Sequence, residues 1–417
     1  MDTEHDGLGT TSGRMAEPAR VDDGTSSEGT RRDGADTESV EWSVVDSAES
    51  LDRAVASLAA GTGPFAIDAE RAGGYRYSQR AYLVQVTRNG AETFLIDPIA
   101  VKDLSPLAGV LASDEWILHA ASQDLPCLTE LGLVPPSLFD TELAGRLLGK
   151  ERVGLGPLLA ESLDVHLAKQ HSAVDWSSRP LPRSWLEYAA LDVVHLVALR
   201  DLLADELAEA GKHEWARQEF AHLITAQPKP PRADPWRRTS RITDARSRRG
   251  LAVVRELWTV RDQIAREIDK APGKLVNDRA IMAIAVKDPL PRSLPSGRTF
   301  RVQRARWETA YARALSLPES ELPPRRGPAR EGLPDPRNWK NVKPDAAERL
   351  PKVREALAEL AEEHGLPQEN ILSPAIQRQI AWKGGNVRTV LEASDARPWQ
   401  VELVVPAVEA ALSTTAG

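Results

Sequence analysis

The spacing of apolar positions changes along the chain, and the change predicts how it is organised. From residue 41 to residue 120, short apolar runs between turn signals indicate strands, whereas later segments repeat with helical period. The predicted strands lie near the start of 41–60, at 64–70, in a hairpin over 82–98 that turns at Asn89-Gly90, and at 115–120. Helices are predicted in the rest of 41–60, opened by Asp46 or Ser47, and at 122–131, 139–148, 154–163 and 183–210. Strands first and helices interleaved later predict one α/β domain over 39–224.

The chain outside this domain divides into a tail, two linkers and two helical regions. Residues 1–38 are polar and acidic with few large apolar side chains, so a disordered tail is predicted. Proline- and arginine-rich segments at 225–245 and 323–335 are predicted to be linkers. They separate two small all-α domains predicted at 246–322 and 336–413.

The two helical regions contain a weak internal repeat. Residues 265–285 align with 361–381 at an offset of 96, and each copy places a capping residue after an apolar pair. Asn277 or Asp278 is the predicted cap in the first copy, and Ser373, before a proline, in the second. Two amphipathic helical segments can also resemble each other by coincidence. We interpret them as two copies of one small helical module.

Charge is distributed unevenly, although the formal net charge of the chain is −8. Residues 1–40 hold 10 Asp/Glu against 4 Lys/Arg, whereas residues 229–307 hold 20 Lys/Arg against 8 Asp/Glu. A basic block of that size attracts phosphate by counterion release, although a solvated helical surface is the alternative. No apolar run reaches the roughly 18 residues of a membrane span, and the N-terminus has no secretory pattern. With one cysteine, Cys127, in an apolar context, we expect a cytoplasmic protein.

Two carboxylates mark the end of a predicted buried strand. Asp68 and Glu70 stand at i and i+2, so both side chains project to one face. Phe65 and Ile67 just upstream indicate burial, where unpaired charge is costly. The pair therefore calls for a counter-ion. Such pairs also occur by chance, and a solvated pair at a strand end is the structural alternative.

Three further side chains extend this set. Asp124 follows the strand at 115–120 and is expected in the first turn of the next helix, with Ser122 as a candidate cap; there an acid is also favoured by the helix dipole alone. Tyr188 and Asp192 stand at i and i+4 on one largely apolar helix and share a face. They could hold a water molecule beside a bound cation, or form a core tyrosine bonded to an acid.

Taken together, these motifs resemble the ribonuclease D family, the tyrosine subgroup of the DEDD 3′→5′ exonucleases. The first motif is matched by Asp68 and Glu70, the second by Asp124 and the third by Tyr188 with Asp192. The approach to the last motif, HSAVDWSSRPLPRSWLEYAALDV, is also similar, and the two helical modules look like HRDC domains. The resemblance covers residues from about 41 to 413. Ala120 departs from it, because many proofreading relatives carry Asn four residues before this aspartate.

The resemblance implies a ribonuclease H-like mixed sheet with flanking helices and a metal-dependent 3′→5′ exoribonuclease. Two divalent cations, Mg²⁺ or Mn²⁺, would be held by Asp68, Glu70, Asp124 and Asp192. Tyr188 would orient the attacking water, and a nucleoside 5′-monophosphate would be released. RNA with free 3′ ends, such as tRNA precursors, would be the partner. We expect a monomer, without a membrane or nucleotide cofactor, because no Walker-type or GxGxxG loop opens a helix.

Other candidate binding residues are supported by fewer sequence features. His119 could lie near the 3′ end of the substrate, although neither it nor His195 has metal-ligand spacing, and a packed histidine is the more common role. Arg246, Arg248 and Arg249 are candidate phosphate contacts in the basic block. Five tryptophans of the helical modules could stack on bases, or could be core or groove residues of small helical domains: Trp258, Trp307, Trp339, Trp382 and Trp399. Two other functions remain open: a 3′→5′ DNA exonuclease of the repair type, and an RNA-binding scaffold without activity.

Overall fold

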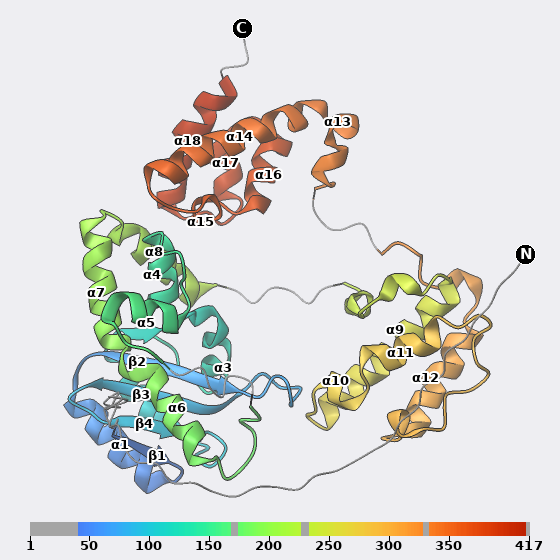
Figure 1. The fold of residues 1–417 in the computed structure, drawn as a ribbon, viewed down its shortest axis with the longest axis horizontal. Coiled ribbons are helices and arrows are strands. Elements are labelled where there is room, and N and C mark those ends of the chain that lie inside the picture. The colour runs from blue at the N-terminus through green and yellow to red at the C-terminus, as the bar shows by residue number, and fades with distance from the viewer. Residues whose placement is uncertain (1–40, 168–173, 227–232, 328–332, 414–417) are drawn as a thin grey trace, which may run out of the picture. The chain divides into compact units, whose positions relative to one another are not determined.

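The computed structural model describes residues 41–167, 174–226, 233–327 and 333–413 (Figure 1). The predicted tail at 1–38 lies outside the described residues, as do 227–232 of the first predicted linker and 328–332 of the second. In this part of the chain, no helix has the length and apolar character needed to cross a membrane.

A six-stranded mixed sheet forms the centre of the N-terminal region, in the order β1-β4-β3-β2-β5-β6. Its central strand β2 runs antiparallel to β3 and parallel to β5, while β1 is parallel to β4 and β5 is parallel to β6. The β3–β4 hairpin turns at Gly90, whose φ of 83° favours glycine, as the Asn89-Gly90 signal predicts. The strands are β1 Trp42–Val45, β2 Thr62–Arg71, β3 Ala81–Asn89, β4 Thr93–Ile96, β5 Trp116–Leu118 and β6 Leu138–Asp140.

Helices flank this sheet (Figure 1). They are α1 Ala48–Ala60, α2 Ser105–Leu111, α3 Leu125–Glu130, α4 Thr141–Leu147, α5 Leu155–Leu163, α6 Arg183–Val194, α7 Leu196–Glu209 and α8 His213–Thr225, with a 3₁₀ turn η1 at Ala121–Gln123. Ser47 caps α1 through a reciprocal hydrogen-bonded capping box. The predicted α/β fold class with a mixed sheet and flanking helices is confirmed.

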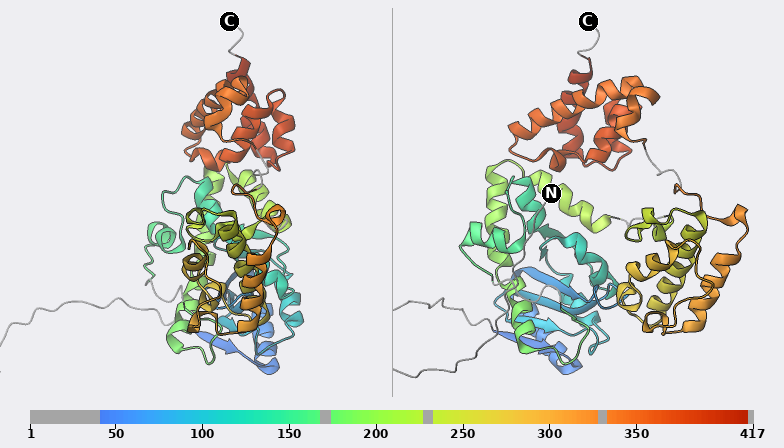
Figure 2. Two further views of the ribbon diagram at one scale, coloured as in Figure 1. Left: turned by 90° about the vertical axis from the view of Figure 1, so that its right-hand side faces the viewer. Right: turned by 45° about the vertical axis from the view of Figure 1, so that its right-hand side comes forward.

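The C-terminal half is helical, and each of its two regions forms a bundle with its own apolar core (Figure 2). The first contains α9 Arg248–Glu267, α10 Pro272–Leu275, α11 Asp278–Ala285 and α12 Arg304–Ser316, with 3₁₀ turns η2 Pro235–Arg238, η3 Ile242–Asp244, η4 Arg298–Phe300 and η5 Glu319–Glu321. The second contains α13 Trp339–Val342, α14 Pro344–Glu363, α15 Gln368–Ile371, α16 Pro374–Lys383, α17 Val387–Glu392, α18 Pro398–Ser413 and the 3₁₀ turn η6 Pro336–Asn338.

The internal repeat is visible in the helices themselves. The bounds of α9 and α14 differ by 96 residues at both ends, and so do those of α10 and α15. Asn277 caps α11 and Ser373 caps α16 through their side-chain oxygens, as the sequence predicts. Trp307 and Trp339 are fully buried, so these two tryptophans fill cores and are not base-stacking surfaces.

Three local predictions are wrong. The segment predicted as a helix from 139 begins as strand β6, and its helix starts at Thr141, because the strand is only three residues long and leaves no alternating pattern. The helix predicted over 183–210 is two helices that meet at His195. Asp124 is the residue that precedes α3 rather than part of its first turn, and Ser122 lies within η1 instead of capping a helix.

Candidate active site

The central strand β2 places the first two carboxylates on one face of the sheet. In the β2–β3 register Asp68 lies opposite Gln85 and Glu70 lies opposite Leu83, and directly paired residues share a face. Leu83 belongs to the apolar cluster that includes Ala189 and Ala190 of α6. The face that carries both carboxylates is therefore the one that α6 covers.

Helix α6 brings the tyrosine and the third acid to this face. Ala189, Ala190 and Val193 are fully buried, and their small side chains let the helix approach the sheet closely. The predicted i,i+4 pair is present, because the side chain of Tyr188 is hydrogen-bonded to that of Asp192.

The segment before α6 is anchored to the sheet by Arg179. Its guanidinium group donates to both oxygens of Asp97, at 2.6 and 2.9 Å, and to the carbonyl of Tyr82 at 2.7 Å. Burial acts to raise the pKa of Asp97, but the hydrogen bonds from Arg179 and from the backbone outweigh it, and the pKa lies below its usual range. Arg179, which the sequence singled out only by resemblance, thus fixes the entry of α6.

Asp124 is held by a loop that depends on Asp140. The carboxylate of Asp140 accepts backbone hydrogen bonds from Ala120 and Ala121 at 3.1 and 2.8 Å, and from Glu142 and Leu143 at the start of α4. Ala120 has a φ of 58°, in the left-handed region that alanine disfavours. Sequence analysis missed Asp140, although an acid directly before the helical run TELAGRLL is an N-cap signal.

Replacing Asp140 with alanine should therefore destabilise the exonuclease region and misplace Asp124. Several buried N–H groups lose their acceptor, and we expect the free energy of unfolding to fall by about 3 kcal/mol. Denaturant titration measures this change. Asp103→Ala is the matched control, because Asp103 also accepts the backbone N–H of the first residue of a helix, Ser105 of α2, but is solvent-exposed, so a much smaller loss is expected there. Equal stability of the two variants would contradict this role of Asp140.

Three carboxylates lie close enough to share one ion. Oxygens of Asp68, Glu70 and Asp192 all lie within 4.8 Å of one another. Asp124 stands apart from this trio and forms an ion pair with Arg71, with 3.2 Å between Nη2 and Oδ1. The structure therefore brings three of the predicted acids together and places Asp124 near enough to act on the pKa of Glu70, with Arg71 as a cation that was not predicted from the sequence.

Burial raises the pKa of every one of these acids, and repulsion from other carboxylates adds to it for Glu70, Asp124 and Asp192. Burial, followed by repulsion from the other carboxylates, raises the pKa of Glu70 to about 9. Burial and the charge of Asp68 raise the pKa values of Asp124 and Asp192 to about 8 each, and burial raises that of Asp68 as well. Arg71 acts in the opposite direction on Asp68, Glu70 and Asp124.

These residues fit divalent cations. Carboxylate oxygens are the ligands that Mg²⁺ and Mn²⁺ prefer, and bound ions would relieve the repulsion that raises the pKa values. Gln85, opposite Asp68 in the register, is fully buried, and its amide oxygen and nitrogen have no hydrogen-bond partner among the described residues. Orphaned polar atoms beside a carboxylate are what a hydrated ion would satisfy.

The remaining candidates lie elsewhere or have structural contacts. Nδ1 of His119 is hydrogen-bonded to the Thr141 hydroxyl at 2.9 Å, and burial lowers the pKa of His119 to about 4, so the ring is neutral. Arg248 donates to the carbonyls of Glu319 and Leu322, and Arg249 to those of Ala314 and Leu317. Arg246 is exposed. Phosphate contact by these three arginines stays a prediction. A substitution of Arg246 alone would test it without disturbing the carbonyl contacts of Arg248 and Arg249.

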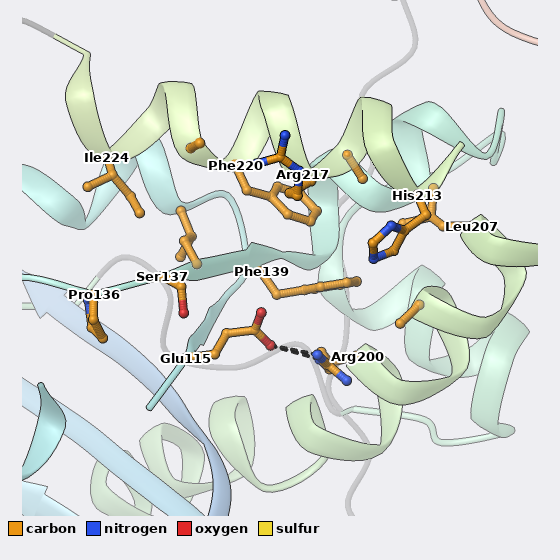
Figure 3. A pocket seen from close by; sticks show the side chains of 14 residues that line it. Glu115, Pro136, Ser137, Phe139, Arg200, Leu207, His213, Arg217, Phe220 and Ile224 are labelled. Atoms are coloured by element: carbon orange, nitrogen blue, oxygen red, sulfur yellow. Dashed lines mark hydrogen bonds and ion pairs between the residues drawn. The ribbon is translucent and has the colours of Figure 1, made fainter. Parts of the chain in front are cut away.

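A cavity of about 260 Å³ lies away from the carboxylates (Figure 3). It is lined by Phe139 and Phe220, whose ring centroids are 4.9 Å apart, and by the ion pair between Glu115 and Arg200. Glu115 and Ser137 directly precede the parallel strands β5 and β6, whereas His119 and Asp124 follow β5. The cavity therefore lies at the opposite end of these strands from Asp124. It contains none of the predicted site residues.

Comparison with known proteins agrees with this geometry. Residues 42–208 match the family described as 3'-5' exonuclease, residues 250–294 match the HRDC domain, and residues 332–412 match the family described as 3' to 5' exonuclease C-terminal domain. The second helical domain is predicted to be HRDC-like, but it matches the exonuclease C-terminal family, and the HRDC match lies in the first helical domain.

Individual relatives extend over most of the chain. Ribonuclease D of Pseudomonas paraeruginosa is 30% identical over 353 residues, 80% of this chain and 88% of the relative. A crystal structure of a protein from Bifidobacterium adolescentis is similar with a TM-score of 0.81 and 36% identity, covering 89% of this chain and 96% of that one. RNase D of Escherichia coli shares the fold, with a TM-score of 0.63 and 24% identity over 90% of this chain and all of that one.

The fold and the acidic site together define a 3′–5′ exonuclease. Within that class the chain belongs to the ribonuclease D family, because it is 30% identical to the ribonuclease D of Pseudomonas over most of the length of both proteins. The resemblance predicted from five side chains is thereby confirmed.

Proposed function

We propose that the protein is a 3′→5′ exoribonuclease that removes nucleotides one at a time from RNA 3′ ends, using two divalent cations. The observation that carries the proposal is the convergence of four carboxylates, with Asp124 buried, the other three half-buried, and Tyr188 beside them. Two ions in such a site stabilise the attacking and leaving oxygens of an in-line displacement at phosphorus.

Each side chain has a distinct task in this proposal. Asp68 would be shared between the two ion positions, with Glu70 and Asp192 completing the first and Asp124 serving the second. The hydroxyl of Tyr188, on the helix turn next to Asp192, would hold the attacking water in line with the terminal phosphodiester. The bond to the 3′ oxygen breaks, that oxygen leaves on the shortened RNA, and the released nucleotide carries a 5′-phosphate.

The charge of the helical half favours a nucleic-acid substrate, and the similar proteins favour RNA. Residues 229–307 carry the excess of Lys and Arg, within a region that includes the HRDC match. The relative from Pseudomonas is named a ribonuclease, and the Escherichia coli enzyme is described as acting in structured RNA processing. We therefore propose structured RNA with a free 3′ end, such as a tRNA precursor, as the substrate. We also propose a cytoplasmic monomer that uses neither a membrane nor a nucleotide cofactor.

A direct assay tests the proposal. Purified protein is incubated with a 5′-labelled, 3′-extended tRNA precursor and with matched RNA and DNA oligomers, with Mg²⁺, with Mn²⁺ and with chelator. Metal-dependent shortening of RNA from the 3′ end is expected. Faster shortening of DNA would favour the repair exonuclease, and RNA binding without hydrolysis would favour the scaffold; either result would contradict the proposal.

Tyr188→Phe should slow the chemical step with little effect on substrate binding. The aromatic ring keeps its packing, and only the hydroxyl that would position water is lost. We expect kcat to fall by about 10²-fold while KM changes by less than about threefold. Steady-state and single-turnover kinetics with RNA measure both values. Tyr311→Phe, which removes a hydroxyl bonded to the Pro291 carbonyl in the first helical bundle, is the control and should leave kcat unchanged. An equal effect of both substitutions would contradict the role of Tyr188.

A further inference from the structure

Arg71 reaches the active site because the β2–β3 ladder is irregular at its end. Glu70 pairs with Leu83, but Arg71 pairs with Ala81, so Tyr82 is an extra residue on β3. In a regular strand, residue 71 would project to the face opposite Glu70. A bulge of this kind re-aims side chains. Here the guanidinium group of Arg71 lies against Asp124, on the same side as the carboxylates.

The contact leaves most of the guanidinium group available. Arg71 Nη2 lies 3.2 Å from Asp124 Oδ1, and among the described residues the Arg71 side chain has no other ion pair and no side-chain hydrogen bond. The Arg71 side chain is 29% exposed, whereas that of Asp124 is 8% exposed. A guanidinium group has five N–H donors, arranged in a fork that suits carboxylate or phosphate. Arg71 is thus a partly exposed cation beside Asp124, with N–H donors available for a further partner.

Charge balance shows what Arg71 can do. Four ionised carboxylates would be neutralised by two divalent cations, which leaves the positive charge of Arg71 in excess. A phosphodiester carries one negative charge, and it balances that excess. Before cations enter, the Arg71 guanidinium is the counter-ion closest to Asp124.

We propose that Arg71 is a positioning residue that competes with a cation for Asp124 and, once displaced, binds a phosphate oxygen of the nucleic acid. The inference rests on the proposed function, because it concerns the same carboxylates. A cation bound at Asp124 would lie close to the Arg71 guanidinium, which is 3.2 Å from Oδ1, and repulsion between the two positive charges would favour movement of the guanidinium. Cation entry at Asp124 and phosphate capture by Arg71 are thereby coupled.

The test compares Arg71→Gln with the wild-type protein in two measurements. In the first, Mn²⁺ is titrated calorimetrically into protein without nucleic acid, and the weaker of the two binding steps should become about tenfold tighter once the competing guanidinium is gone. In the second, short single-stranded RNA is degraded at saturating Mg²⁺, and KM should rise about tenfold while kcat changes by less than about threefold. Arg71→Lys keeps the charge, so its Mn²⁺ affinity and its KM should lie between those of the wild-type protein and Arg71→Gln.

Arg53→Gln is the matched control, because Arg53 is 66% exposed and its ion pair among the described residues is with Glu49 on α1; it should leave both measurements at wild-type values. Unchanged or weaker Mn²⁺ binding by Arg71→Gln would overturn the competition with the cation, and an unchanged KM would overturn the phosphate contact. These failures are distinct from failure of the proposed function, in which the wild-type protein itself would neither bind Mn²⁺ at these carboxylates nor shorten RNA.

Discussion

Asp68→Asn is expected to abolish exonuclease activity while leaving the fold intact. Asp68 lies on the central strand, within 4.8 Å of Glu70 and Asp192, and its charge acts on every other acid of the site. Asparagine keeps the shape of the side chain but supplies no charge to share between two cations. A loss of roughly 10⁴-fold or more in kcat is expected, as for other residues that act as a unit in catalysis. Removal of a 3′-terminal label from RNA measures it.

The control for this substitution is Asp201→Asn. Asp201 lies on α7 beside Arg200, and its side chain is 59% exposed. This variant should retain wild-type activity, and circular dichroism should show that both proteins remain folded. Near wild-type trimming by a folded Asp68→Asn protein would exclude the assigned site.

The second large effect is on stability. In the metal-free protein, the pKa of Glu70 rises from 4.5 to about 9, and those of Asp124 and Asp192 rise from 3.8 to about 8. At pH values between the ordinary pKa and the raised pKa of a carboxyl group, the folded state holds a proton that the unfolded state has released. The stabilisation that these protons give the folded state is therefore complete below a pH of about 4. It is lost as pH rises through the pKa values of the folded state. The free energy of unfolding therefore falls as pH rises through that window.

Denaturant unfolding at a series of pH values, with chelator or with saturating Mg²⁺, tests this linkage. With chelator, stability should fall from pH 5 to pH 8, and Asp192→Asn should fall less steeply because one titrating group is gone. With Mg²⁺ the fall should disappear, since bound ions keep the carboxylates ionised in the folded state. Identical curves with and without Mg²⁺ would show that the carboxylates bind no ion.

The parts of the site that follow from local spacing could be predicted from the sequence. Asp68 and Glu70 share a face because they are two residues apart on a strand, and Tyr188 and Asp192 share a face because they are four apart on a helix. Most strands and helices of the α/β domain could also be predicted, because the spacing of apolar residues is likewise a local property of the sequence.

What depends on tertiary contacts could not be predicted. The position of Arg71 follows from an extra residue on the neighbouring strand, which strand alternation does not reveal. Asp140 binds the backbone of a loop about 20 residues earlier. Arg248 and Arg249 looked like free phosphate contacts because their acceptors lie about 70 residues further along the chain. Strand β6 is too short to have a periodicity of its own.

The central claim, that these carboxylates hold a pair of cations, is tested most directly by anomalous diffraction from crystals soaked in Mn²⁺. Two peaks about 3.5–4 Å apart are predicted, one against Asp68, Glu70 and Asp192 and the other against Asp68 and Asp124. Mn²⁺ bound only at other sites, or no Mn²⁺ between these carboxylates in crystals soaked to saturation, would contradict the claim.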